Sequence, residues 1–309
     1  MKTNYPCIYK CQNENNPIVE ILMLTYNHEK FIEEALQSIL MQKTSYSYKI
    51  KIGEDCSTDS TRKIVMDYYN QYPDKIELYL WEKNVGSNKN AIEIMKGCKG
   101  KYFICIEGDD YWTDPLKLEK QISFLEEHSE YIGTAHNIKC VDKNGELLHC
   151  DFGLYPILEE HIYGRKQAEN FELVSQTTSL LYRNIWKDWS RQDLEELFLI
   201  PGNGDIKISI LLGLSGDIYF FRDIMAAHRR VFTGESWTAK THSKNMIWYN
   251  YVSYCSIWKY MKEHINVSVN TNNMCNWLIK DSWMQLLCNF NKENIITLGR
   301  LLKNKIVGV

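Results

Sequence analysis

Three carboxylates and two aromatic rings follow directly on one apolar segment of the chain. Residues 102–106 are apolar, and they are followed by Glu107, Gly108, Asp109, Asp110, Tyr111 and Trp112. Crowded acids are unfavourable unless a cation lies beside them. Magnesium and manganese are commonly held by one or two carboxylates together with phosphate oxygens of a substrate. The segment therefore predicts a metal-diphosphate site, and a turn in which Asp caps a helix is the structural alternative.

Three other predicted strands also end in polar residues. Tyr26 and Asn27 follow residues 18–25, Glu54 and Asp55 follow 49–53, and Asn84 and Gly86 lie just beyond 76–80. The carboxyl ends of parallel strands meet at one edge of a sheet, where ligands of open α/β sheets bind. We therefore expect all four polar segments to lie together at that edge.

The elements that must position these residues alternate between strand and helix. Helical patterns follow each of the four apolar segments, and Asn27 is the expected N-cap of the first helix. This order predicts an α/β fold with a mostly parallel sheet and helices on both faces. Further strands are expected at 131–141, 177–182 and 217–221, with a helix at 206–212. The chain contains neither a dinucleotide-binding Gly-x-Gly-x-x-Gly nor a P-loop.

Composition narrows the class of protein. The 309 residues are 44% hydrophobic and carry a formal net charge of -3, which provides a sizeable core and argues against nucleic acid as a partner. Because no run approaches the roughly 18 apolar residues that cross a bilayer, we expect a cytoplasmic protein, at most peripheral at the membrane. The ten cysteines show no recurring spacing and are expected to be reduced thiols.

The polar segments, in their order and spacing, resemble a known family. Thr25-Tyr26-Asn27, Glu54-Asp55, Asn84-x-Gly86 and Glu107-Gly108-Asp109-Asp110 are similar to motifs of the family 2 glycosyltransferases, which have the GT-A (Rossmann-like) fold. The resemblance is close over residues 18–125 and looser over 177–237. It implies an inverting transfer of a sugar from a nucleotide-diphosphate sugar, with UDP-sugars favoured, to a hydroxyl of a glycan or lipid-linked acceptor. It also implies a requirement for Mn2+ or Mg2+.

The resemblance assigns roles to individual residues. Asp109 is the expected main metal ligand, and Glu107 stands in the variant position of the family's Asp-x-Asp motif, where it contacts either the metal or the ribose. Asp205 is the expected catalytic base, with a simple helix cap as the alternative. The remaining residues expected to bind the nucleotide-sugar are Thr25, Tyr26, Asn27, Glu29, Glu54, Asp55, Asn84, Gly86, Gly108, Asp110, Trp112 and Arg229.

The sequence pattern and the resemblance together suggest how the chain is divided into domains. Residues 1–17 are expected to be an irregular lead-in, and 18–240 the GT-A domain, with a nucleotide-sugar half at 18–125 and an acceptor half at 126–240. Residues 241–309 are expected to form a helical extension that contacts the domain, another subunit or a membrane surface. The expected setting is synthesis of a bacterial surface polysaccharide. A non-catalytic scaffold of the same fold and a sugar-nucleotide pyrophosphorylase are the alternative functions.

Overall fold

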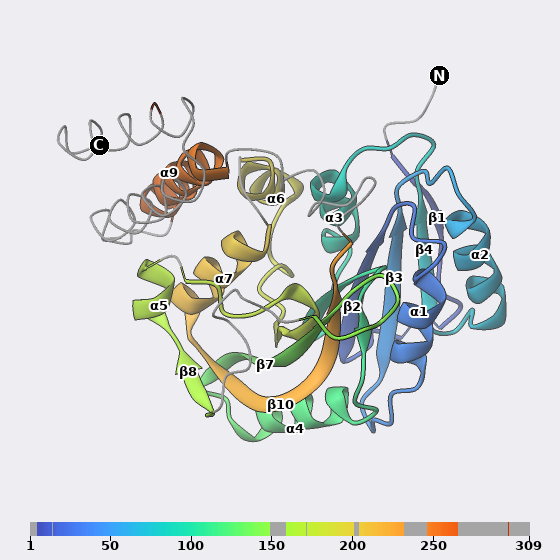
Figure 1. The fold of residues 1–309 in the computed structure, drawn as a ribbon, viewed down its shortest axis with the longest axis horizontal. Coiled ribbons are helices and arrows are strands. Elements are labelled where there is room, and N and C mark those ends of the chain that lie inside the picture. The colour runs from blue at the N-terminus through green and yellow to red at the C-terminus, as the bar shows by residue number, and fades with distance from the viewer. Residues whose placement is uncertain are drawn as a thin grey trace.

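The computed structural model describes residues 5–13, 15–148, 159–170, 172–200, 204–231, 246–264 and 296. In this part of the chain ten strands form one sheet, which runs in the order β1-β4-β3-β2-β5-β9-β7-β10-β6, with β8 paired to β10. The predicted α/β architecture with a mostly parallel central sheet and helices is confirmed (Figure 1).

The first half of the chain forms four parallel strands in the order β4-β3-β2-β5. Their bounds agree with the predicted strands to within one residue at either end: β2 (Val19–Thr25), β3 (Tyr48–Glu54), β4 (Ile76–Leu80) and β5 (Tyr102–Glu107). The helices that connect and follow them are α1 (Ile32–Leu40), α2 (Thr61–Gln71), α3 (Ser87–Met95) and α4 (Lys117–Glu127). Because the four strands are parallel, they present their carboxyl ends at the same edge.

Two hydrophobic cores lie on opposite faces of the sheet, as the alternation of side chains along a strand requires. In β2, Ile21 and Met23 pack with residues of α1, α2 and α4, whereas Leu22 packs with residues of α3 and of helices from the second half. Figure 1 shows α1 and α2 together beside the parallel strands and α6 and α7 across the sheet from them. Both faces of the central strands are therefore buried, which explains their nearly continuous apolar sequences.

The second half extends the same sheet. The strands are β6 (Tyr111–Trp112), β7 (Tyr131–Val141), β8 (His161–Tyr163), β9 (Leu181–Arg183) and β10 (Asp217–Arg229). The helices are α5 (Arg165–Glu169), the 3-10 helix η1 (Thr177–Ser179), α6 (Arg191–Phe198), α7 (Gly204–Ser215) and α9 (Met246–His264). Strand β10 is longer than predicted; it pairs irregularly with β7, and it also pairs with β8 near its start and with β6 near its end.

Several local predictions are wrong. Residues 1–17 are not wholly irregular, because β1 (Cys7–Tyr9) pairs antiparallel with β4. The expected strand 177–182 is instead the 3-10 helix η1 followed by β9. Asn27 does not cap α1, which begins at Ile32; Asn27 adopts a left-handed conformation with φ 55. Cys140 is disulfide-bonded, whereas the six other described cysteines are free.

The predicted helical extension falls largely outside the described residues. Helix α9 lies near its start, while residues 265–309 lie outside, apart from residue 296. Residues 232–237, the last part of the segment with the looser family resemblance, also lie outside. Among the described residues, no helix combines the length and the apolar character needed to cross a membrane.

Candidate active site

The carboxyl ends of β2, β3 and β5 bring three of the predicted segments together. In the sheet register Thr25 lies opposite Glu54 of β3, and Leu24 lies opposite Glu107 of β5. The turns that follow these strands therefore share one edge, as the sequence pattern predicts. The chemistry of this edge depends on which side chains remain available there.

Gly108 allows the acidic segment to lie directly against the end of β2. Its backbone N–H donates to the carbonyl of Leu24 at 2.9 Å. A Cβ atom on Gly108 would stand 2.7 Å from Thr25 Oγ1 and 2.8 Å from His28 Nδ1, which is closer than such atoms approach in proteins. Only glycine therefore fits, and the close approach carries Asp109 toward His28.

Asp109 has a carboxylate oxygen that the described residues leave without a partner. Its Oδ1 atom is buried and accepts no hydrogen bond, while Oδ2 lies 3.9 Å from His28 Nε2. Burial raises the pKa of the Asp109 carboxyl, and the neighbouring Asp110 adds to this effect. A buried carboxylate oxygen without a donor is costly, and a bound cation relieves that cost. This oxygen therefore fits the metal ligand that the sequence predicts.

Glu107 lies beside Asp109 and keeps access to solvent. The surrounding protein, together with Asp109 and Asp110, raises the pKa of the Glu107 carboxyl to about 8. A divalent ion would offset this repulsion. No group of three or more His, Cys, Asp or Glu side chains is arranged to hold a metal within the described part of the chain. Glu107 and Asp109 would thus need substrate oxygens to complete a coordination shell.

Asp110 turns away from Asp109 and joins the acidic segment to the end of β10. Its Oδ1 accepts a hydrogen bond from the backbone N–H of Arg229 at 2.9 Å and lies 3.1 Å from His228 Nδ1. Burial alone would lower the pKa of His228, but Asp110, Glu107 and Asp109 together raise this pKa to about 9. His228 therefore places a positive charge among the acids. Sequence reasoning did not select His228, although it directly precedes Arg229.

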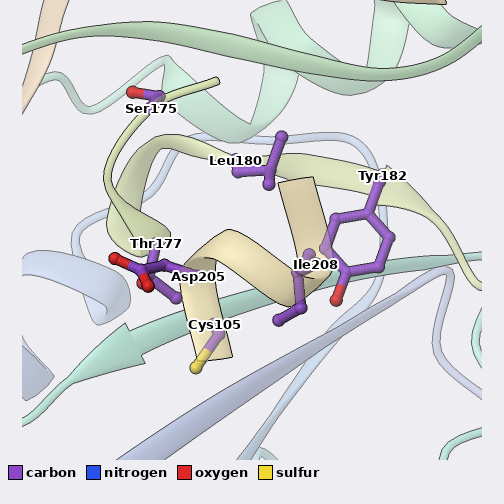
Figure 2. Close-up of a pocket in the computed structure, with 7 residues that line it drawn as sticks. All are labelled: Cys105, Ser175, Thr177, Leu180, Tyr182, Asp205 and Ile208. Atoms are coloured by element: carbon purple, nitrogen blue, oxygen red, sulfur yellow. The ribbon is translucent and has the colours of Figure 1, made fainter. Parts of the chain in front are cut away.

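Asp205 lies in the first turn of α7. Its Oδ1 accepts from the backbone N–H of Ile206 at 2.8 Å, and the side chain is half-buried. Burial raises the pKa of Asp205, and its charge in turn contributes to the raised pKa of Glu107. Figure 2 shows Asp205 beside Thr177 at a pocket that is also lined by Cys105 of β5. The fold therefore brings Asp205 beside the acidic segment.

Residues 20–189, more than half of the chain, match the family model for glycosyl transferase family 2. The chain belongs to this family. Solved structures with the same fold include Staphylococcus aureus TarS 1-349 in complex with UDP-GlcNAc, at 17% identity and a TM-score of 0.64 over 92% of this chain and 79% of that one. Another is the mannosyltransferase PcManGT from Pyrobaculum calidifontis in complex with GDP-Man and Mn2+, at 14% identity and a TM-score of 0.52, covering 96% of this chain and 77% of that one.

The alignments with proteins of similar sequence cover only part of each relative's length. An uncharacterized protein of Mycobacterium tuberculosis is 31% identical over 215 residues, which are 69% of this chain and 58% of the relative. TuaG of Bacillus subtilis, whose name assigns it to teichuronic acid biosynthesis as a glycosyltransferase, is 32% identical over 113 residues, or 37% of this chain and 44% of TuaG. The chain thus spans less than two thirds of these proteins.

In this family 2 glycosyltransferase, hydrogen bonds join the turn after β2 to the turn after β3. Asn27 Oδ1 accepts from the backbone N–H of Thr58 at 2.8 Å, and Glu29 Oε2 accepts from that of Ser60 at 2.9 Å. Asp55 accepts from the backbone N–H groups of Val85 and Gly86 at 2.7 and 2.8 Å. Gly86 has a φ of +85, which favours glycine. These residues shape the turns, and direct contact with a nucleotide stays a prediction.

Glu54 and Trp112 do not occupy the positions expected of nucleotide-sugar ligands. The Glu54 carboxylate is fully buried, where it accepts from the Ser57 backbone N–H and pairs with Arg62. The Trp112 ring is 1% exposed and packs in the core, with the Lys117 amine 4.5 Å from its centroid. Both side chains are therefore enclosed by the protein, away from the exposed positions expected of residues that bind the nucleotide-sugar.

Arg229 also differs from its predicted role. Its guanidinium is buried, where Nε donates to the Asp109 carbonyl at 3.0 Å and Nη2 pairs with Glu34. The guanidinium lies 4.7 Å from the centroid of the Phe31 ring. Because these donors already have partners in the protein, Arg229 holds the backbone of the acidic segment in place. It is not available in this arrangement to bind a diphosphate.

The other residues predicted to bind the nucleotide-sugar differ in how far their side chains are exposed to solvent. Thr25 is buried, and its hydroxyl lies 3.3 Å from His28 Nδ1, so it shapes the turn. Tyr26 is half-buried and Asn84 is exposed, so both remain accessible to a ligand. Their contact with a nucleotide remains a prediction.

Proposed function

We propose that this family 2 glycosyltransferase is a metal-dependent, inverting enzyme that transfers a sugar from a nucleotide-diphosphate sugar to an acceptor hydroxyl. One observation carries the proposal: Asp109 and Asp205 both act electrostatically on the Glu107 carboxyl at the strand ends, and Asp109 keeps a buried oxygen without a partner in the described structure. A site that only stabilised the fold would be expected to pair that oxygen.

The donor half of the proposal concerns the diphosphate. Asp109, with Glu107 beside it, would hold Mn2+ or Mg2+, and phosphate oxygens of the donor would complete the shell. When bound, a divalent ion stabilises the negative charge that develops on the departing diphosphate. PcManGT is described in complex with GDP-Man and Mn2+, and TarS with UDP-GlcNAc, which supports a donor of this class. Of the possible nucleotides we propose UDP.

The acceptor half of the proposal concerns Asp205. Inversion requires a base on the face of the sugar opposite to the leaving diphosphate. In the proposed reaction the acceptor oxygen bonds to the anomeric carbon as the bond from that carbon to the diphosphate breaks. Asp205 takes the acceptor proton. Its position on α7, in the second half of the chain and facing Glu107, is suitable for this role.

The acceptor is proposed to be a glycan or a lipid-linked saccharide of a bacterial surface polysaccharide. Support comes from TuaG, whose name places it in teichuronic acid biosynthesis. Because the chain spans less than half of TuaG, this setting is the broadest part of the proposal.

The stereochemistry of the product tests inversion without knowledge of the acceptor. We expect slow transfer of the sugar from an α-linked UDP-sugar to water, with Mn2+ present, because Asp205 can take a proton from water as from a hydroxyl. Proton NMR recorded before the free sugar equilibrates should show the β anomer first. A product that appears first as the α anomer would show retention and would refute the inverting mechanism.

A further inference from the structure

Asp205 lines a pocket whose other residues have no role in the reaction proposed above. Figure 2 shows the side chains that line it. They come from β5, from the segment that includes η1, from β9 and from α7: Cys105, Ser175, Thr177, Leu180, Tyr182, Asp205 and Ile208. The interior of the pocket has room for about one water-sized group, so it suits a small substituent such as a methyl group at its bottom and not an entire small ligand.

The pocket opens beside the reacting groups. Cys105 and Glu107 are two residues apart on β5, so their side chains lie on the same face of the sheet. At the other wall stands Asp205, the proposed base. A sugar positioned for transfer would therefore have a substituent within reach of this pocket.

The lining combines an apolar interior with a polar edge. Leu180, Ile208 and the Tyr182 ring are buried and contribute hydrocarbon surface. The Thr177 hydroxyl, by contrast, is half-buried and has no hydrogen-bond partner among the residues that the structure describes. A ligand that contacts both the hydrocarbon surface and the Thr177 hydroxyl must have an apolar group next to a hydrogen-bond acceptor.

We propose that the pocket receives the acetamido group of an N-acetylated sugar, an inference that rests on the proposed glycosyltransferase activity. The acetamido methyl would pack against Leu180 and Ile208, and the acetamido carbonyl would accept a hydrogen bond from the Thr177 hydroxyl. A sugar hydroxyl in the same place would lie against hydrocarbon with fewer partners, which is unfavourable. A deoxysugar methyl would leave the Thr177 hydroxyl unpaired.

The acetamido group has two possible sources, because the lining comes from both halves of the chain. Cys105 is on a strand of the nucleotide-sugar half, which points to the donor sugar, whereas Thr177 and Ile208 belong to the acceptor half. The chemistry is the same in both cases. The experiment therefore has one arm for each source.

The donor arm compares UDP-GlcNAc with UDP-glucose, and UDP-GalNAc with UDP-galactose, by calorimetric titration with Mn2+. We expect the N-acetylated member of at least one pair to bind about 10-fold more tightly, as for other small groups that fill a pocket. In the acceptor arm, the protein with UDP and Mn2+ receives the methyl glycosides of N-acetylglucosamine and of glucose. Saturation-transfer NMR should then show the strongest contact at the acetamido methyl.

Two variants test whether the pocket causes the preference. Ile208→Phe should fill it and reduce the preference to about 1-fold, with the affinity for UDP itself unchanged. Leu214→Phe is the matched control, because Leu214 is half-buried on the same helix and does not line the pocket, so the preference should persist. Thr177→Val removes only the hydroxyl and should weaken the preference even if Ile208→Phe fails to fold.

Each result has a defined meaning. A preference in the donor arm, or only in the acceptor arm, supports the pocket and identifies its source. If neither arm shows a preference while UDP binds, or if Ile208→Phe retains the preference in full, the proposal is overturned. Failure of UDP itself to bind would refute the proposed donor. The acceptor arm would then be repeated without nucleotide. A contact at the acetamido methyl would support the pocket, and no contact there would overturn the proposal.

Discussion

Asp109→Asn is expected to lower the metal-dependent affinity for the nucleoside diphosphate and the turnover of the sugar donor by about 100- to 1000-fold each. Asn keeps the size of the side chain but removes the charge that a divalent ion requires. The buried Oδ1 atom without a partner is the structural reason to expect so large an effect. Calorimetry with and without Mn2+ measures the binding, and release of the diphosphate measures turnover.

The fold should survive this substitution. Burial raises the pKa of the Asp109 carboxyl, which shows that a charge at this position is unfavourable when no metal is present. Neutral Asn should therefore leave the midpoint of urea unfolding unchanged or raise it. Asp223→Asn is a suitable control, since Asp223 is exposed on β10 and pairs at 3.6 Å only with Lys120 among the residues described. Unchanged metal-dependent binding in Asp109→Asn would remove this residue from the metal site.

Asp205→Asn is the second substitution with a large expected effect. Loss of a general base lowers kcat by about 100- to 10,000-fold, and the affinity for the donor should remain within about twofold of the unsubstituted protein. The reason is that Asp205 contacts the acceptor proton and, in this account, not the diphosphate. Initial rates at saturating donor, together with donor titrations, separate the two quantities.

The alternative role of Asp205, as a helix cap, predicts a different result. Asn caps helices as well as Asp does, so a residue that only accepts from the Ile206 backbone N–H would tolerate the change. Asp67→Asn, at an exposed position of α2, serves as the control for loss of a single negative charge. Turnover at the unsubstituted rate in folded Asp205→Asn would show that another group is the base.

Much of the site could be predicted because strand ends are easily recognised. The apolar segments that became β2, β3, β4 and β5 are bounded by polar turns, and a parallel sheet must bring those turns to one edge. That reasoning requires no knowledge of side-chain partners. It placed Asp109 at this edge, whereas Asp205, which belongs to the other half of the chain, was expected at the site only because of the family resemblance.

The residues that were predicted wrongly are those whose role depends on a distant partner. Glu54 is neutralised by Arg62 from α2, and Arg229 is engaged by Glu34 from α1. Trp112 is covered by the core against which β6 packs. None of these contacts follows from spacing along the sequence, so an acid or an aromatic residue near a motif appeared available when it was not.

The same limit applies to His228 and to β1. His228 acquires its charge from Asp110, more than a hundred residues earlier in the chain, and only the pairing of β10 with β6 brings the two together. Strand β1 is short and exposed, so its sequence lacks the alternation that marks a half-buried strand. Its pairing with β4 therefore depends on the edge that β4 offers.

Calorimetric titration of UDP, GDP and dTDP into the protein, each with and without Mn2+, tests the central claim most directly. We expect UDP to bind in the presence of Mn2+ and its affinity to fall by at least about 100-fold when Mn2+ is removed. Failure of all three nucleotides to bind folded protein would contradict a nucleotide-sugar site and would favour a scaffold of this fold without catalysis. Equally tight binding with and without the metal would contradict the metal site at Asp109.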